Sequence, residues 1–104
     1  MTRPSNGKPL EFRVSFSGAI AKVIDELRYE AFLSGRLEQF NRAWRVILQR
    51  LRSDPSNFGE LIQPFVHLKL KTFVGSVYPL TVRFGVHEDL PIVFIAKVVL
   101  AALS

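Results

Sequence analysis

The chain has 104 residues, 48% of them hydrophobic, which fits one compact domain and excludes a disordered chain. Its 14 Lys and Arg outnumber 9 Asp and Glu, and the net charge of +5 suits an anionic partner such as nucleic acid or an acidic protein without proving either. There is no cysteine, so disulfides and thiolate catalysis are excluded.

Residues 1–10 are polar and lack the apolar core of a secretory signal, so we expect a flexible tail ahead of a single domain over residues 11–104. The apolar run Pro91–Leu103 is interrupted by Lys97 and is shorter than the ~20 residues that span a bilayer. The sequence therefore favours a cytoplasmic protein with no membrane partner.

A short strand is expected over residues 11–16, where Phe12, Val14 and Phe16 alternate with polar residues. Ser17 then suits the N-cap of a helix, because its hydroxyl can accept a hydrogen bond from a free backbone N–H of the first turn. Apolar residues recur at helical spacing, and Ser34-Gly35 ends this helix, since glycine readily takes the left-handed conformation.

A second helix is expected from Arg36 to Ser53, and it ends before Pro55, because proline disfavours helical geometry in the residue that precedes it. So short a link between two helices predicts an antiparallel hairpin. The following residues, 56–66, are expected to form a loop that packs three apolar side chains inward: Phe58, Leu61 and Phe65.

Three strands are expected next, over residues 67–74, 77–87 and 91–100, with turns at Gly75-Ser76 and at residues 88–90. In the first of these strands, Leu68, Leu70 and Val74 are expected to face inward, and His67, Lys69, Lys71 and Phe73 to lie on the other face. The sequence thus predicts an α+β domain: an N-terminal strand, a two-helix antiparallel hairpin, and a three-strand antiparallel meander that forms a sheet covered on one face by the helices.

Motifs for most enzyme chemistries are missing. The chain has neither a phosphate-binding glycine loop, a dinucleotide-binding motif nor a nucleophile elbow. His67 and His87 lie in different segments, and two isolated histidines are too few for a metal site. We therefore expect no cofactor and no metal.

Positive charge on the predicted sheet is the clearest functional feature. Lys69 and Lys71 lie on one strand, Arg83 on the next and Lys97 on the last. If the strands pair as consecutive hairpins, these four side chains converge on the face away from the helices. Such a cluster attracts a phosphodiester backbone, so all four residues are candidates for RNA binding.

Lys97 interrupts the most apolar strand, and burial of a lone charge costs several kcal/mol. Strict alternation would place Val93, Ile95 and Val99 on its face, which is typical of a groove or an interface that a partner covers. The alternative is a solvated face on which the charges only keep the sheet soluble.

Several segments resemble the RelE/ParE superfamily of bacterial type II toxins. They are Phe12–Phe16, Phe40–Leu51, Asp54–Glu60, Leu68–Lys71, Leu80–Asp89 and Ile92–Ile95. The resemblance implies a strand, a helical hairpin and a following antiparallel sheet. Its ribonuclease members cut mRNA on the ribosome with basic side chains, and other members inhibit DNA gyrase. Both kinds are neutralised by an antitoxin encoded beside them, which wraps the toxin surface.

The sequence departs from the nuclease members of that family at two places. Thr81 stands where an arginine is expected, although Arg83 faces the same way two residues on, and the C-terminal catalytic His, Arg or Tyr is missing. No general base can be named, so the catalytic residues are unknown and ribonuclease activity is expected to be weak or absent.

The leading hypothesis is a RelE/ParE-like protein that binds a small acidic antitoxin and engages mRNA or the ribosome through a basic sheet face. One alternative is a non-enzymatic interaction module, which forms a homodimer or pairs its last strand with a partner peptide. The other is a gyrase-directed inhibitor.

Overall fold

The structure is a computed structural model that describes residues 11–65 and 69–103. The tail predicted over residues 1–10 and the predicted facing of Phe65, His67 and Leu68 lie outside what the structure describes. In chain order the elements are β1 (Arg13–Ser15), α1 (Gly18–Leu33), α2 (Leu37–Ser53), the 3-10 turn η2 (Pro55–Asn57), β2 (Glu60–Phe65), β3 (Leu70–Val77), β4 (Leu80–His87) and β5 (Ile92–Leu100).

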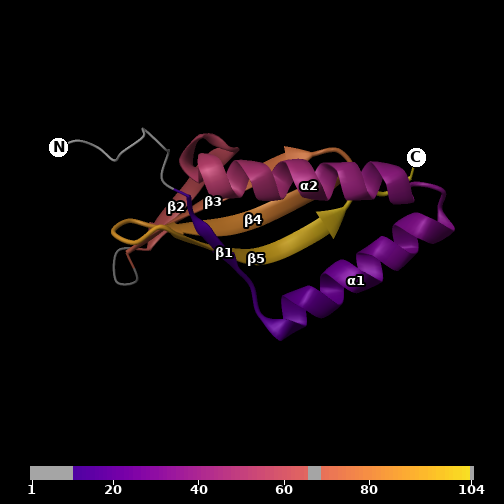
Figure 1. The fold of residues 1–104 in the computed structure, drawn as a ribbon, viewed down its shortest axis with the longest axis horizontal. Coiled ribbons are helices and arrows are strands. Elements are labelled where there is room, and N and C mark those ends of the chain that lie inside the picture. The colour runs from indigo at the N-terminus through magenta and orange to yellow at the C-terminus, as the bar shows by residue number, and fades with distance from the viewer. Residues whose placement is uncertain (1–10, 66–68, 104) are drawn as a thin grey trace.

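The strands form one five-stranded sheet in the order β1-β5-β4-β3-β2. Strands β2 to β5 are a continuous antiparallel meander, while β1 pairs in parallel with β5 at the other end of the sheet. Figure 1 shows α2 lying across the sheet, and α1 lying beside β5 at an angle to α2. The predicted α+β class, with helices packed on the sheet, is confirmed, but the sheet is mixed and its meander has an additional strand.

The additional strand is β2, in the segment that we expected to be a loop. It pairs with β3 from Glu60 opposite Val74 to Phe65 opposite Leu70, with an irregularity in register between Leu61 and Gln63. Phe58 is buried as expected, whereas Leu61 is 55% exposed and does not pack inward.

The turn predicted at Gly75-Ser76 is wrong, because β3 continues to Val77 and the chain reverses at Tyr78-Pro79. Gly75 instead faces Phe58, whose ring lies 2.6 Å from the position that a Cβ at residue 75 would take. Glycine is needed here for close packing rather than for a turn.

Local sequence features set the helix ends. The backbone N–H of Ile20 donates a hydrogen bond of 3.2 Å to Ser17 Oγ, which confirms the predicted N-cap of α1. Gly35 follows α1 with a φ of 75°, and α2 ends before Pro55. No helix among the described residues is long and apolar enough to cross a membrane.

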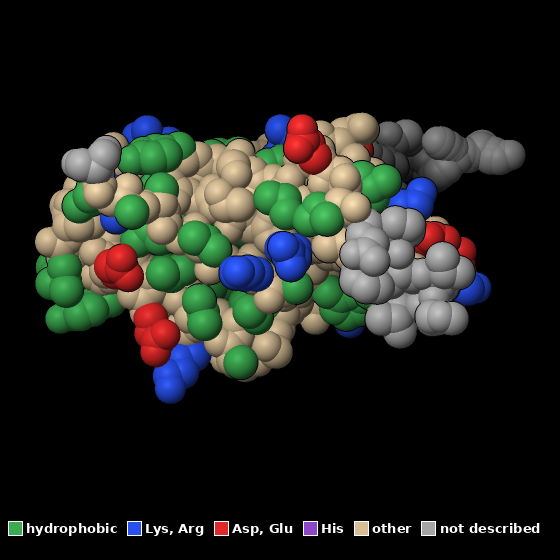
Figure 2. Space-filling view, turned by 180° about the vertical axis from the view of Figure 1, so that it is seen from behind, with side chains coloured by type: hydrophobic (Ala, Val, Ile, Leu, Met, Phe, Trp, Pro, Cys, Tyr) green, Lys and Arg blue, Asp and Glu red, His purple; other side chains and the backbone are tan. Residues whose placement is uncertain are grey.

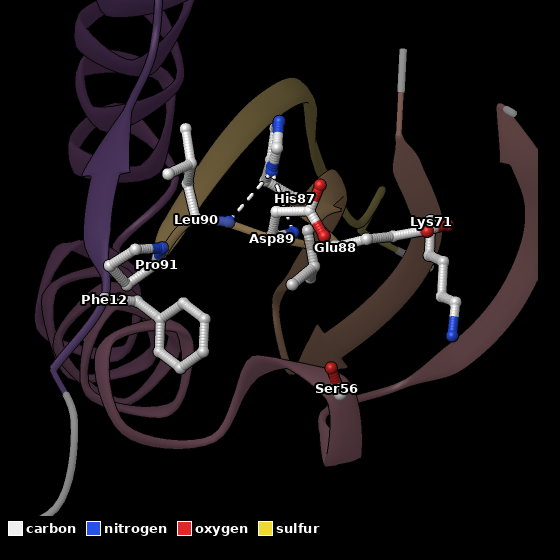
Figure 3. Close-up of a pocket in the computed structure, with 9 residues that line it drawn as sticks. Phe12, Ser56, Lys71, His87, Glu88, Asp89, Leu90 and Pro91 are labelled. Carbon is white, nitrogen blue, oxygen red and sulfur yellow. Dashed lines mark hydrogen bonds between the residues drawn. The ribbon is translucent and has the colours of Figure 1, made fainter. Parts of the chain in front are cut away.

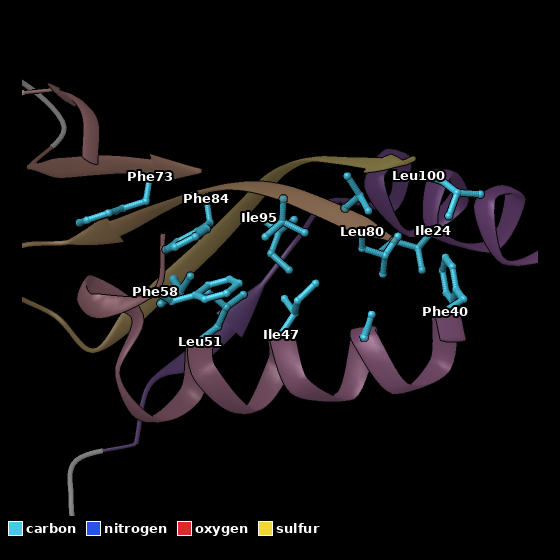
Figure 4. Packing of buried hydrophobic residues seen from close by; sticks show 14 of the residues in the cluster. Ile24, Phe40, Ile47, Leu51, Phe58, Phe73, Leu80, Phe84, Ile95 and Leu100 are labelled. Atoms are coloured by element: carbon cyan, nitrogen blue, oxygen red, sulfur yellow. The ribbon is translucent and has the colours of Figure 1, made fainter. Parts of the chain in front are cut away.

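The core lies between the helices and one face of the sheet (Figure 4). Phe84 is fully buried between Phe58 and Phe73, with ring centroids 5.7 Å and 5.5 Å away and the rings close to parallel. The guanidinium of Arg36, only 7% exposed, donates a hydrogen bond of 2.6 Å to the carbonyl of Ala101. This contact fixes the end of β5 against the turn between the helices.

Candidate binding surface

Two cations lie side by side on the sheet face that the helices leave uncovered. Arg83 of β4 is directly opposite Lys97 of β5, and residues directly opposite in an antiparallel pair project from the same face. The residues that follow them along the strands, Phe84 and Val98, are buried on the helix side. Arg83 and Lys97 are both exposed, and neither forms an ion pair with another described residue.

A β-bulge in β5 puts Lys97 in this position. The pairing passes from Arg83–Lys97 directly to Phe84–Ile95, so Ala96 is an extra residue without a partner of its own. Ala96 and Lys97 are therefore both exposed, while Ile95 is only 3% exposed.

The bulge changes which apolar residues accompany Lys97. The prediction that Val93 and Ile95 share its face is wrong, because both are buried on the helix side. Val99 does share that face and is 44% exposed. Phe94, opposite Gly85 and 40% exposed, is the neighbour that strict alternation missed, and only the bulge places it there.

The uncovered face is therefore mostly apolar or neutral around two charges. Figure 2 shows two Lys or Arg side chains next to each other in the middle of the molecule, with hydrophobic side chains on several sides. A short hydrogen bond of 2.8 Å between the hydroxyls of Ser76 and Thr81 adds a neutral polar border. We call Arg83, Phe94, Ala96, Lys97 and Val99 the open face.

Lys71 does not belong to the open face. It is opposite Val86 and lies on the same side of β3 as Phe73, which is 5% exposed in the core. For Leu70, Lys71, Phe73 and Val74, the inward and outward assignment predicted for this strand is thus reversed. The prediction that four cations converge on the uncovered face is wrong, since only Arg83 and Lys97 do.

Lys69 lies just before β3 and pairs with the turn after β4. Its ammonium donates a hydrogen bond of 2.9 Å to Asp89 Oδ2. This contact lowers the pKa of Asp89 below its ordinary value and raises the pKa of Lys69. Lys69 therefore already has an anionic partner within the chain, unlike Arg83 and Lys97.

A pocket of about 470 Å³ lies at the end of the sheet near Lys71 (Figure 3). Beside Lys71 it is lined by Phe12, Ser56, Val86, His87, Glu88, Asp89, Leu90 and Pro91. One lysine and two carboxylates, those of Glu88 and Asp89, are among the lining residues, so the pocket favours no ligand of one charge.

His87 is not arranged as a base in this pocket. Its Nδ1 accepts hydrogen bonds of 3.0 Å from the backbone N–H groups of Asp89 and Leu90, which places the proton of the neutral ring on Nε2. Figure 3 shows the free nitrogen of His87 and the ammonium of Lys71 pointing in opposite directions. The two side chains do not form a catalytic pair.

Comparison with protein-family models, with curated proteins and with solved structures finds no match. Among residues 11–65 and 69–103, no three His, Asp or Glu side chains gather closely enough to hold a metal ion. Within the described residues, the open face combines two cations that form no ion pair with exposed apolar side chains, and it is therefore the candidate binding surface.

Proposed function

We propose that the chain is a RelE/ParE-like protein of the type II toxin kind, which acts through protein binding and is neutralised by a small acidic antitoxin bound to the open face. The observation that carries this proposal is the cross-strand pair of Arg83 and Lys97. Like charges directly opposite each other destabilise a sheet. A carboxylate from a partner, placed between them, would convert that repulsion into two favourable contacts.

The apolar surroundings favour a protein partner over RNA. Phe94 and Val99 flank the two cations, and both keep about two fifths of their surface in water. An acidic segment with apolar side chains would cover these residues and neutralise the charges together. Two phosphate contacts alone give single-stranded RNA only a small electrostatic gain, since the salt dependence grows with each phosphate neutralised.

Co-expression tests this function. The tagged chain is produced in bacteria alone and together with the protein encoded by the neighbouring reading frame. We expect production alone to arrest growth, and the neighbouring product to restore growth and co-purify with the chain.

Unrestricted growth with the chain alone, or a neighbouring product that neither binds nor restores growth, would contradict the proposal. Retention of single-stranded RNA by the purified chain, with steep loss as salt rises, would replace the acidic protein by RNA as the ligand of the open face. If growth stops, gyrase is inhibited and the chain retains no RNA, then gyrase is the target of the toxic action.

A further inference from the structure

We propose that, before any other partner binds, the open face is covered by α1 of a second copy of this chain in a symmetric dimer. Each α1 would lie on the open face of the other copy. The proposal uses the same face as the proposed function, but it concerns self-association and does not require that the chain be a toxin.

The outer side of α1 has the composition of an interface. Glu26, Tyr29, Glu30 and Leu33 are spaced so that they share one side of the helix. Tyr29 is 62% and Leu33 66% exposed, which are unusually large values for two neighbouring apolar side chains of this size.

Acidic residues outnumber basic ones on this side of α1: Lys22 lies one turn before Glu26, but Glu26 and Glu30 give the side a net charge opposite to that of the open face. Glu26 and Glu30 are exposed and form no ion pair with any residue that the structure describes. The acidic residue Asp25 differs, because it pairs with Arg28 on the same helix at 3.1 Å. Two unpaired carboxylates on α1 thus match the two unpaired cations of the open face.

Both surfaces face the same way, as a symmetric dimer requires. Figure 2 shows Asp or Glu side chains along the margin of the molecule where α1 lies, and the two central Lys or Arg side chains in the same view. When two copies meet face to face about a two-fold axis that runs between this margin and the middle of the sheet, the α1 margin of each lies over the sheet of the other. The exposed side chains of Tyr29 and Leu33 would then pack against Phe94 and Val99.

Charge reversal on either surface tests the dimer. Sedimentation equilibrium at micromolar concentrations should find wild type as a dimer and both double variants, Arg83→Glu with Lys97→Glu and Glu26→Lys with Glu30→Lys, as monomers. We expect each double variant to weaken dimerisation by about 100-fold, because every contact occurs twice in a symmetric dimer and both copies are lost. All four positions are exposed, and unchanged circular dichroism would confirm that both variants stay folded.

An equimolar mixture of the two variants is the decisive sample. One variant then presents an acidic face and an acidic helix, and the other a basic face and a basic helix, so both contacts of a mixed dimer are attractive. The mixture should dimerise although each component alone is monomeric. A monomeric wild type, dimeric double variants or a mixture that stays monomeric would overturn the proposal.

The helix variant also separates this proposal from the proposed function. Glu26→Lys with Glu30→Lys leaves Arg83 and Lys97 intact and should still bind the neighbouring acidic protein as a monomer. Loss of dimerisation with retained partner binding supports both proposals. If the mixing test succeeds but no form of the chain binds the neighbouring protein, the dimer proposal stands and the proposed function is contradicted.

Discussion

Gly59→Ala is expected to destabilise the protein by roughly 3 kcal/mol or more, enough to unfold much of a small domain. Gly59 has a φ of 87°, a conformation that costs an alanine roughly 1–2 kcal/mol. In addition, an added Cβ would lie 2.1 Å from the carbonyl oxygen of Val74 and 2.6 Å from its carbonyl carbon. These atoms belong to β3, so the sheet backbone itself would have to move. Urea unfolding followed by circular dichroism measures the loss.

Two other glycines serve as controls that separate the effect of the positive φ from the effect of the contact with Val74. Gly35 also has a positive φ, of 75°, but an added Cβ meets nothing within 4 Å, so Gly35→Ala should cost only about 1 kcal/mol. Gly18 has open space and no such φ, and Gly18→Ala should leave stability almost unchanged. Equal losses at Gly59 and Gly35 would show that contact with Val74 does not matter.

Phe84→Ala should cost about 4 kcal/mol, in the middle of the range for removal of a core aromatic ring. The ring is fully buried and is the middle member of the stack with Phe58 and Phe73. Its removal leaves a cavity between η2 and the sheet, where neither remaining ring can fill the space without a shift of the backbone. We expect the urea concentration at the unfolding midpoint to fall, while the dependence of the unfolding free energy on urea stays unchanged.

Leu61→Ala is the control for that prediction. Leu61 is apolar but 55% exposed, so its truncation should change stability by less than about 1 kcal/mol. A large loss at Leu61, or a small one at Phe84, would mean that the burial of these two side chains differs from the one described.

The helices were predictable because short-range features define them. Ser17 supplies an N-cap, Gly35 a left-handed residue and Pro55 a stop, and each acts within one turn of its own position. These contacts do not depend on the rest of the fold. The α+β class followed from the same features together with the order of helices and strands.

The candidate site was harder to predict, because strand faces depend on pairing. In β3 the residues Leu70 and Val74 alternate with Lys71 and Phe73, so either face could be the apolar one, and burial of Phe73 decides the matter. The prediction that Val93 and Ile95 share the face of Lys97 was wrong for a similar reason. One bulge reverses the facing of every residue beyond it.

The edge strand β2 escaped prediction because its sequence looks like a loop. Gly59 and Pro64 flank or interrupt it, and proline disfavours the interior of a sheet. At an edge, however, a proline is tolerated where no neighbouring strand needs its N–H. Only the long-range pairing with β3 shows that the segment is extended.

Isothermal titration calorimetry of the neighbouring acidic protein against three forms of the chain tests most directly whether the open face is the binding surface. The forms are wild type, Arg83→Glu with Lys97→Glu, and a control, Arg42→Glu with Arg45→Glu, which changes two exposed arginines of α2 and alters the net charge equally. The open-face variant should bind at least ~10-fold more weakly than wild type, and the control should stay within about 2-fold of it. Equal weakening by both variants, or none by the open-face variant, would contradict the assignment of the open face.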